Sequence, residues 1–313
     1  MIGPAFLGNN ILDESELICH SESVSVLFAD PQRRGVVQEL PFSKYAKGGS
    51  RSGRKPALHM MLESYFDDSS DDKRARYCVS GGLIGREQDW DKFVVMWSPK
   101  ARTLREPFRS TDCECGHGQF EDWTIEKRRA LMSDIVSAVI NSRVMGFASI
   151  VSADGYKKAF PNCKKDDAYM LTIPHTLMNM AFVADELGMD MNVWFESGKH
   201  DSKILKIFKD IKAMNWGPAR RLRAISFDGK ELYPLQAADL IAREAFKHVD
   251  NEGKKNTRIP VSRLVGSLSF HVWREKSLAD LASKGGPNNL ELLRYWDGNP
   301  GAPEFIGRRK ISK

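Results

Sequence analysis

The spacing of apolar and polar residues becomes regular from about residue 61 onward, and this pattern predicts an ordered domain. Short runs rich in apolar and β-branched residues, bounded by turn residues, are typical of strands. We expect strands at residues 61–67, 77–84, 147–151, 191–196 and 222–227. The acidic, serine-rich run 68–72 separates the first two, which we expect to form a hairpin.

Between and after these strands, apolar residues recur at the three- and four-residue spacing of helices. We expect helices at residues 87–97, 123–142, 168–187, 202–213 and 235–248, with shorter ones at 277–283 and 290–295. Strands that alternate with helices at this spacing are typical of a sheet covered by helices. The sequence therefore predicts an α/β fold.

Composition narrows the class of protein. The chain has 313 residues, 42% of them hydrophobic and 28% charged, which excludes collagen-like and wholly disordered proteins. No run reaches the roughly 18 apolar residues of a membrane span, and the first residues do not resemble a signal peptide. The five cysteines are scattered and odd in number. This favours a reducing, cytoplasmic location over a disulfide framework.

The first sixty residues differ from the rest. Residues 1–30 contain five acidic and no basic residues, whereas residues 31–60 contain seven basic residues and one acidic residue. We expect a disordered extension here; the alternatives are a nucleic-acid-binding arm and a translation start at Met60 or Met61. The predicted organisation is this extension, one α/β domain over 61–250, and a helical extension with a basic tail over 251–313.

Three acidic residues stand out by their positions. Asp67 ends the first predicted strand, Glu196 ends a later one, and Asp239 lies in an otherwise apolar helix. A carboxylate in a packed helix is costly to bury unless it is paired or binds a metal, and ligands gather at strand ends in α/β sheets. If the three lie about 4–7 Å apart, they can bind Mg²⁺ or Mn²⁺ for phosphodiester hydrolysis. Alternatively, Asp67 is a turn residue and Asp239 is a surface partner of Arg243.

Two motifs resemble a known family. The sequence Leu-Gln-Ala-Ala-Asp-Leu at 235–240 matches a Leu-Gln-x-Ala-Asp-Leu helix, and Tyr-Phe-Asp-Asp-Ser-Ser at 65–70 is similar to an apolar strand followed by Asp-Glu-Ser-Gly. The second match departs from the pattern at Asp68 and Ser70. Residues 61–250 thus resemble the domain-of-unknown-function family 3800, a bacterial group with a ribonuclease-H-like fold.

The resemblance implies a ribonuclease-H-like mixed sheet of about five strands flanked by helices. It also implies acids on the first strand, a later strand and the last helix. Asp67, Glu196 and Asp239 fill these places, Glu196 by position rather than by motif. Nuclease activity is then inferred only from other proteins that have this fold, and a fold alone does not determine function.

Other residues are accessory candidates. His117, in the sequence Cys-Glu-Cys-Gly-His at 113–117, is a candidate proton-transfer residue; a zinc site there lacks a second ligand pair. Asp68 and Asp201 are further candidate metal ligands, although Asp201 could instead cap a helix. Five basic residues are candidates for contact with a phosphate backbone, with solvated surface as the alternative: Lys157, Lys158, Arg220, Arg221 and Arg223.

These observations favour one function over two alternatives. The net charge of +6 permits a nucleic-acid partner, and no Gly-x4-Gly-Lys-Ser/Thr phosphate-binding loop is present. We therefore expect a Mg²⁺- or Mn²⁺-dependent nuclease or nuclease-like protein. The alternatives are a non-catalytic nucleic-acid-binding or defence-associated module on the same fold and, less favoured, a small-molecule phosphohydrolase.

Overall fold

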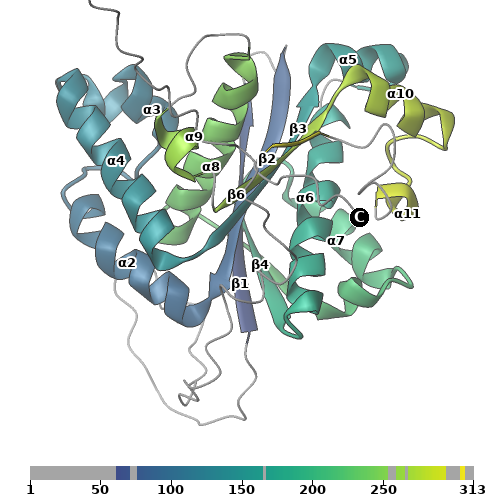
Figure 1. Ribbon diagram of the computed structural model, residues 1–313, viewed down its shortest axis with the longest axis horizontal. Helices are drawn as coiled ribbons and strands as arrows, with labels where there is room; N and C mark the ends of the chain where they lie inside the picture. Colours follow the sequence, from purple (N-terminus) through teal and green to yellow (C-terminus); the bar gives the residue numbers. More distant parts are fainter. Residues whose placement is uncertain are drawn as a thin grey trace, which may run out of the picture.

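The structure is a computed structural model of the chain (Figure 1). It describes residues 61–70, 76–164, 167–252, 259–264, 267–293 and 304–306. The expectations for residues 1–60 and for the basic tail lie outside the described residues. None of the helices in the described ranges has the length and hydropathy needed to span a bilayer.

One mixed sheet forms the centre of the molecule. Its strand order is β5-β4-β1-β2-β3-β6-β7. The strands β1, β3, β4, β5 and β6 run parallel to one another, and β2 and β7 run against them. The bounds are β1 (Met61–Ser70), β2 (Tyr77–Arg86), β3 (Met145–Ser152), β4 (Asp190–Glu196), β5 (Leu222–Asp228), β6 (Leu268–Trp273) and β7 (Glu304–Ile306).

The sheet contains the five expected strands and two more. β6 pairs with β3 in parallel and β7 pairs with β6, so the sheet continues beyond the domain expected to end at residue 250. The six residues of β6 are all buried. Apolar Leu268, Phe270 and Val272 alternate with polar Ser269 and His271, but helices cover both faces, so the polar residues are buried as well.

Helices cover both faces of the sheet (Figure 1). One face is covered by α2 (Glu87–Ala101), α3 (Ser110–Cys115), the short 3-10 helix η2 (Gly118–Phe120), α4 (Ile125–Ser142), α8 (Tyr233–Asp250) and α9 (Ile259–Leu264). The other face is covered by α5 (Ala153–Ala159), α6 (Asp167–Glu186), α7 (Asp201–Ala213), η3 (Gly217–Arg221), α10 (Glu275–Ser283) and α11 (Leu290–Leu293). A separate hydrophobic core fills each side. The three-layer arrangement confirms the α/β prediction.

The two hydrophobic cores show toward which face of the sheet the side chain of each strand residue points. Tyr65 of β1 and Trp194 of β4 belong to the core beneath α8, whereas Phe66 and Phe195 belong to the core beneath α6. Because side chains alternate along a strand, residues two positions after Tyr65 and Trp194 also face α8. This alternation determines where the acids at the strand ends point.

Helix α8 lies directly against β2. A Cβ atom added to Gly81 of β2 would lie 2.7 Å from both Cα and N of Ala242 in α8. Asp67 is the partner of Gly81 in the antiparallel pairing of β1 with β2. The missing side chain at Gly81 therefore lets the helix approach the sheet close to Asp67.

Candidate functional site

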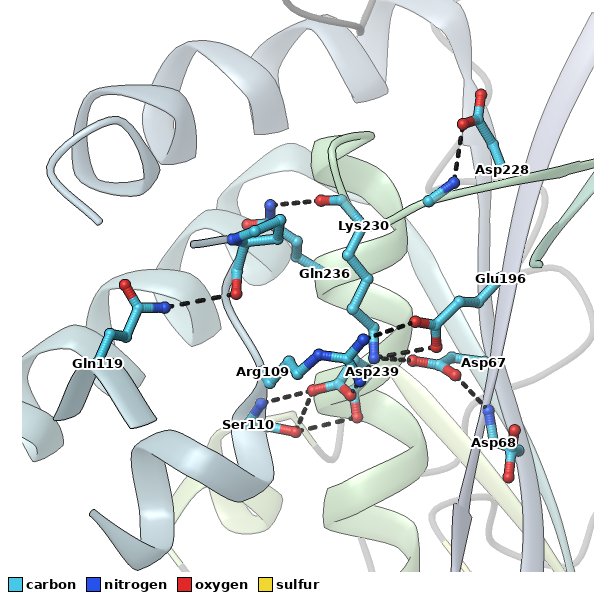
Figure 2. Close-up of polar contacts among 12 residues, drawn as sticks. Asp67, Asp68, Arg109, Ser110, Gln119, Glu196, Asp228, Lys230, Gln236 and Asp239 are labelled. Carbon is cyan, nitrogen blue, oxygen red and sulfur yellow. Dashed lines mark hydrogen bonds and ion pairs between the residues drawn. The ribbon is translucent and has the colours of Figure 1, made fainter. Parts of the chain in front are cut away.

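Three carboxylates gather around the ammonium group of Lys230 (Figure 2). Lys230 lies between β5 and α8 and is only 5% exposed. Its Nζ lies 2.7 Å from Asp239 Oδ1, 2.9 Å from Asp67 Oδ2 and 3.1 Å from Glu196 Oε2. Because each oxygen is so close to one nitrogen, any two of them are at most about 6 Å apart.

The strands bring two of these acids side by side. Phe66 of β1 pairs in parallel with Phe195 of β4, so the next residues, Asp67 and Glu196, are neighbours at the carboxyl end of the sheet. Both point to the α8 side, where Asp239 is buried in the helix. The structure therefore brings together the three acids that the sequence singled out.

The second oxygen of each carboxylate has its own donor. Asp67 Oδ1 accepts a hydrogen bond from the backbone N–H of Asp68 at 2.7 Å. Glu196 Oε1 accepts one from Arg109 Nη2 at 3.2 Å. Asp239 Oδ2 accepts from the backbone N–H of Ser110 at 2.6 Å and also from the Ser110 hydroxyl. Each carboxylate is thus oriented by contacts on two sides.

The helix motif at 235–240 also holds the backbone of Lys230. Gln236 Nε2 donates to the Lys230 carbonyl at 2.7 Å, and Trp97 Nε1 donates to Gln236 Oε1 at 2.8 Å. Gln236 and Asp239 are three residues apart, on one side of α8. The motif therefore binds both ends of Lys230, its carbonyl and its ammonium group.

The charges in this cluster shift the pKa values of its members in different directions. Burial raises the pKa of Asp67 well above its usual range, and the nearby Asp239 and Glu196 raise it further against the opposing effect of Lys230. Burial also acts to raise the pKa of Asp239, but Lys230 and the Ser110 hydrogen bonds outweigh it and lower that pKa. Burial disfavours the charged form of Lys230, but the three carboxylates outweigh this and raise its pKa.

The donor set suits a hard divalent cation. Carboxylate oxygens are the ligands that Mg²⁺ and Mn²⁺ prefer, and the buried Asp67 Oδ2 has an ion pair with Lys230 at 2.9 Å as its contact. In the described part of the chain, however, no three His, Cys, Asp or Glu side chains stand at metal-binding spacing. One oxygen of each carboxylate instead lies at ion-pairing distance, 2.7–3.1 Å, from Lys230 Nζ. Asp67, Glu196 and Asp239 are the residues that would hold a metal.

The accessory acids take other positions. The Asp68 side chain points away from the three carboxylates (Figure 2), as strand alternation requires. Asp201 begins α7, and its carboxylate accepts hydrogen bonds from Gly198 N at 2.8 Å and Ser197 Oγ at 3.0 Å. It stabilises the turn after β4 and does not cap α7, whose N-cap residue is His200. His117 is exposed ahead of η2, and no contact recorded among the described residues joins its imidazole to the carboxylates.

The predicted basic residues lie at two ends of the sheet. Lys157 and Lys158 are exposed on α5, which follows the carboxyl end of β3, and Lys158 pairs with Glu275 at 3.2 Å. The other three form ion pairs with acids at the far end: Arg220 and Arg221 with Asp185, and Arg223 with Asp190. Asp190 begins β4 and Glu196 ends it, so these pairs lie roughly 20 Å from the carboxylates at about 3.3 Å per residue.

Sequence reasoning missed four residues of the site. Lys230, Gln236, Arg109 and Ser110 all contact the three acids or position a residue that does. Lys230 had one available signal, because it follows a strand in an Asp-Gly-Lys turn just before the matched motif. Arg109 and Ser110 follow an irregular loop, and the sequence contains no signal that marks them as site residues.

The alternative pairing of Asp239 does not form. Arg243 instead pairs with Glu114 of α3, with Nη2 2.8 Å from Oε2. This contact and the Ser110 hydrogen bonds attach α3 to α8. The Asp239 carboxylate is therefore a buried member of the cluster rather than a surface partner of Arg243.

Comparison with solved structures finds similarity to ribonucleases H. RNase HII of Archaeoglobus fulgidus, in a complex with PCNA, is 13% identical with a TM-score of 0.31, over 80% of this chain and 96% of that chain. Bst-RNase HIII in complex with Mn²⁺ is 12% identical with a TM-score of 0.37, over 80% and 74%. A mutant of Bst-RNase HIII has the same identity and TM-score, over 75% and 65%. No family model and no curated protein matches the sequence.

Similarity at this level says nothing about function. The fold class instead follows from the order and direction of the strands, in which β2 runs antiparallel between β1 and β3 while β1, β4 and β5 are parallel. This mixed sheet flanked by helices confirms the α/β, ribonuclease-H-like fold class expected from the sequence. The difference is its size, because the sheet has seven strands rather than about five.

Proposed function

We propose that this protein is a metal-dependent nuclease, with Asp67, Glu196 and Asp239 as ligands for Mg²⁺ or Mn²⁺. One observation carries the proposal: an oxygen from each of these carboxylates lies within 3.1 Å of a single buried nitrogen. Concentrating three carboxylates in a buried place opposes folding unless the group is compensated. The Lys230 ammonium and the half-exposed Arg109 guanidinium, which contacts Glu196, compensate only part of the charge of three ionised carboxylates, which leaves a site that attracts a divalent cation.

The residues around the cluster suit a phosphodiester substrate. A bound divalent ion would stabilise charge on the phosphoryl oxygens and lower the pKa of a bound water. Arg109 uses one donor on Glu196 while its side chain is 54% exposed, so other donors of its guanidinium can meet a phosphate oxygen. Ser110 orients Asp239 through two hydrogen bonds. A nucleic acid is the substrate class that we propose.

The proposal includes the resemblance to family 3800. In its support, the two polar residues of the matched helix motif, Gln236 and Asp239, both contact Lys230. The motif thus has a physical role in positioning a residue at the centre of the site. The non-catalytic module is the second candidate, and Lys230 is the observation that favours it, because a lysine can compensate acids permanently.

Cleavage assays on matched variants test the nuclease proposal. Single- and double-stranded DNA, RNA and hybrid substrates are incubated with Mg²⁺, with Mn²⁺ or with chelator. We expect Asp67→Asn and Asp239→Asn to lower the metal-dependent rate on the order of 100-fold or more, because each removes a charged ligand. Asp68→Asn is the matched control, since it changes the adjacent carboxylate that points away; its rate stays within about threefold of the unmodified protein.

Three outcomes contradict this proposal. Cleavage that continues in chelator excludes a role for the metal. A cleavage rate lowered equally in Asp68→Asn means that the three carboxylates have no role that the adjacent Asp68 does not share. Binding of nucleic acid without cleavage under every condition favours the non-catalytic module instead.

A further inference from the structure

Lys230 occupies the point that all three carboxylates share. Its ammonium is the positive charge at the centre of the three acids, with Arg109 contacting Glu196 only from outside, and its side chain is 4% exposed. We propose that Lys230 is a tethered cation that competes with the divalent metal: its ammonium holds the acids together without metal and withdraws when metal binds. This inference rests on the metal site of the proposed function.

A divalent ion held by the same three oxygens would take the position of Lys230 Nζ. The three oxygens lie 2.7–3.1 Å from Nζ, whereas Mg²⁺ binds oxygen at about 2.0–2.1 Å. An ion at the position of Nζ would need each oxygen to move inward by only about 1 Å or less. The ammonium and the ion cannot occupy that point together, so one must leave.

Charge favours the exchange. When all three carboxylates are ionised they carry three negative charges, part of which Arg109 balances at Glu196. Lys230 supplies one positive charge to the centre, where a divalent ion supplies two. The attraction between buried opposite charges is stronger than at the surface because the surroundings screen it less. The outer oxygens keep their contacts with Ser110 and Arg109, so the carboxylates remain oriented while the cation at the centre changes.

The local backbone lets the side chain move alone. Gln236 fixes the Lys230 carbonyl at 2.7 Å, and Asp228 Oδ1 accepts from the backbone N–H of Gly229 at 2.7 Å. The turn is therefore held on both sides of Cα. The lysine side chain is a flexible four-carbon chain, so withdrawal can use rotations within that chain while the backbone of the turn stays in place.

Amine labelling of the native full-length chain tests the exchange directly. The protein is treated with an acetylating reagent in chelator or with saturating Mn²⁺, and modification of each lysine is followed by mass spectrometry. We expect Lys230 to be protected in chelator and modified on the order of tenfold faster with Mn²⁺, because withdrawal exposes it. Lys206 is the matched control: its side chain is 76% exposed on α7, and its rate does not depend on Mn²⁺.

A variant gives a second, independent measurement. In Lys230→Gln no ammonium competes, so calorimetry with Mn²⁺ alone gives a dissociation constant on the order of tenfold lower than in the unmodified protein. This factor corresponds to a metal-competent state populated in about a tenth of the molecules. The variant leaves three adjacent acids uncompensated, so its thermal midpoint falls in chelator and rises with Mn²⁺ by more than that of the unmodified protein.

The results separate this inference from the nuclease proposal. Lys230 that stays protected with Mn²⁺ bound, an equal or weaker affinity in Lys230→Gln, or no Mn²⁺ binding at all overturns the exchange. If Lys230→Gln does not fold, the labelling of the unmodified protein decides. Exchange without cleavage of any nucleic acid supports the inference and contradicts the nuclease; metal-dependent cleavage with Lys230 protected throughout does the reverse.

Discussion

The role of a single residue at the end of a strand depends on the face of the sheet toward which its side chain points. Asp67 and Asp68 are adjacent and chemically alike, yet one belongs to a buried cluster and the other points away from it (Figure 2). The pKa of Asp67 is raised first of all by its burial. The role of an acid at this strand end is therefore set by the direction of its side chain.

A buried histidine on the opposite side of the sheet shows the same dependence on environment. His175 of α6 is 3% exposed, and its Nδ1 lies 3.2 Å from Ser149 Oγ. Its ring packs against those of His271 and Trp273. Burial disfavours the charged imidazolium and lowers the pKa of His175 from 6.5 to about 3.

This shift predicts a loss of stability in mild acid. The folded-state pKa lies below the unfolded-state value of about 6.5, so the unfolded chain binds more protons between pH 6.5 and 3. The contribution of His175 is present above pH 6.5 and declines as the pH falls, by about 2 kcal/mol at pH 5. Denaturant unfolding at pH 7.5 and pH 5 measures the loss.

The variant His175→Gln isolates this contribution, because glutamine keeps a hydrogen-bonding group near Ser149 and does not titrate. We expect its free energy of unfolding to depend less steeply on pH than that of the unmodified protein. Equal pH dependence in the two proteins would show that His175 is not the group responsible.

At the scale of elements, helix α8 assembles the site. It supplies Asp239, its Gln236 fixes the Lys230 backbone, and its Ala242 lies against Gly81 of β2. The neighbouring Ala238 is fully buried as well. Small residues at the contact allow the helix to approach the sheet closely enough for its carboxylate to reach Lys230.

Enlarging Gly81 is expected to push α8 away from the sheet. In Gly81→Ala the new methyl group would lie 2.7 Å from helix backbone atoms, which cannot rotate aside. Overpacking of this kind costs about 1–3 kcal/mol. We expect a lower denaturant midpoint and weaker Mn²⁺ binding, because Asp239 moves with the helix.

Gly198→Ala is the matched control for this change. A Cβ atom at Gly198 meets nothing within 4 Å, and its stability is expected to stay within about 0.5 kcal/mol of the unmodified protein. If Gly81→Ala were as stable as Gly198→Ala, the close contact between α8 and β2 would not matter for the fold.

At the scale of the whole molecule, basic residues are divided between the two ends of the sheet. Lys157 and Lys158 follow β3 at the end where the carboxylates lie, whereas Arg220, Arg221 and Arg223 pair with acids at the other end. The first group shares the end of the sheet with Asp67 but lies on α5, on the face opposite to α8. The arginines bind η3 and β5 to their neighbours instead.

This division predicts different effects on nucleic-acid binding. Replacing Lys157 and Lys158 together by Gln should lower the slope of log affinity against log salt by roughly 1–2, because each phosphate contact contributes about 0.7–0.9. Replacing Arg220 and Arg223 by Gln should leave the slope unchanged and lower the thermal midpoint. Fluorescence anisotropy over a salt series measures both slopes. A reduced slope only in the arginine variant would reverse the assignment.

Much of the fold was accessible from local pattern. The period of apolar residues indicated the five strands from β1 to β5 and the main helices, because burial of one face leaves a repeat of about 2 or 3.6 residues. The strand β6 has such a repeat in Leu268, Phe270 and Val272, but it covers only six residues and was not among the expected strands. Its place beside β3 could not be deduced from its own sequence.

The sequence by itself indicated the strands from β1 to β5, the main helices and the candidate acids Asp67, Glu196 and Asp239, because strand ends and an acid in an apolar helix are local features. Only the tertiary structure decided that Lys230 lies between these acids and that Ser110 holds Asp239 across 129 residues of chain. Such contacts depend on how elements pack, and no local pattern records which long side chain will reach a distant carboxylate. The position of the Lys230 ammonium at the centre of the site therefore depends on how the elements pack in the fold.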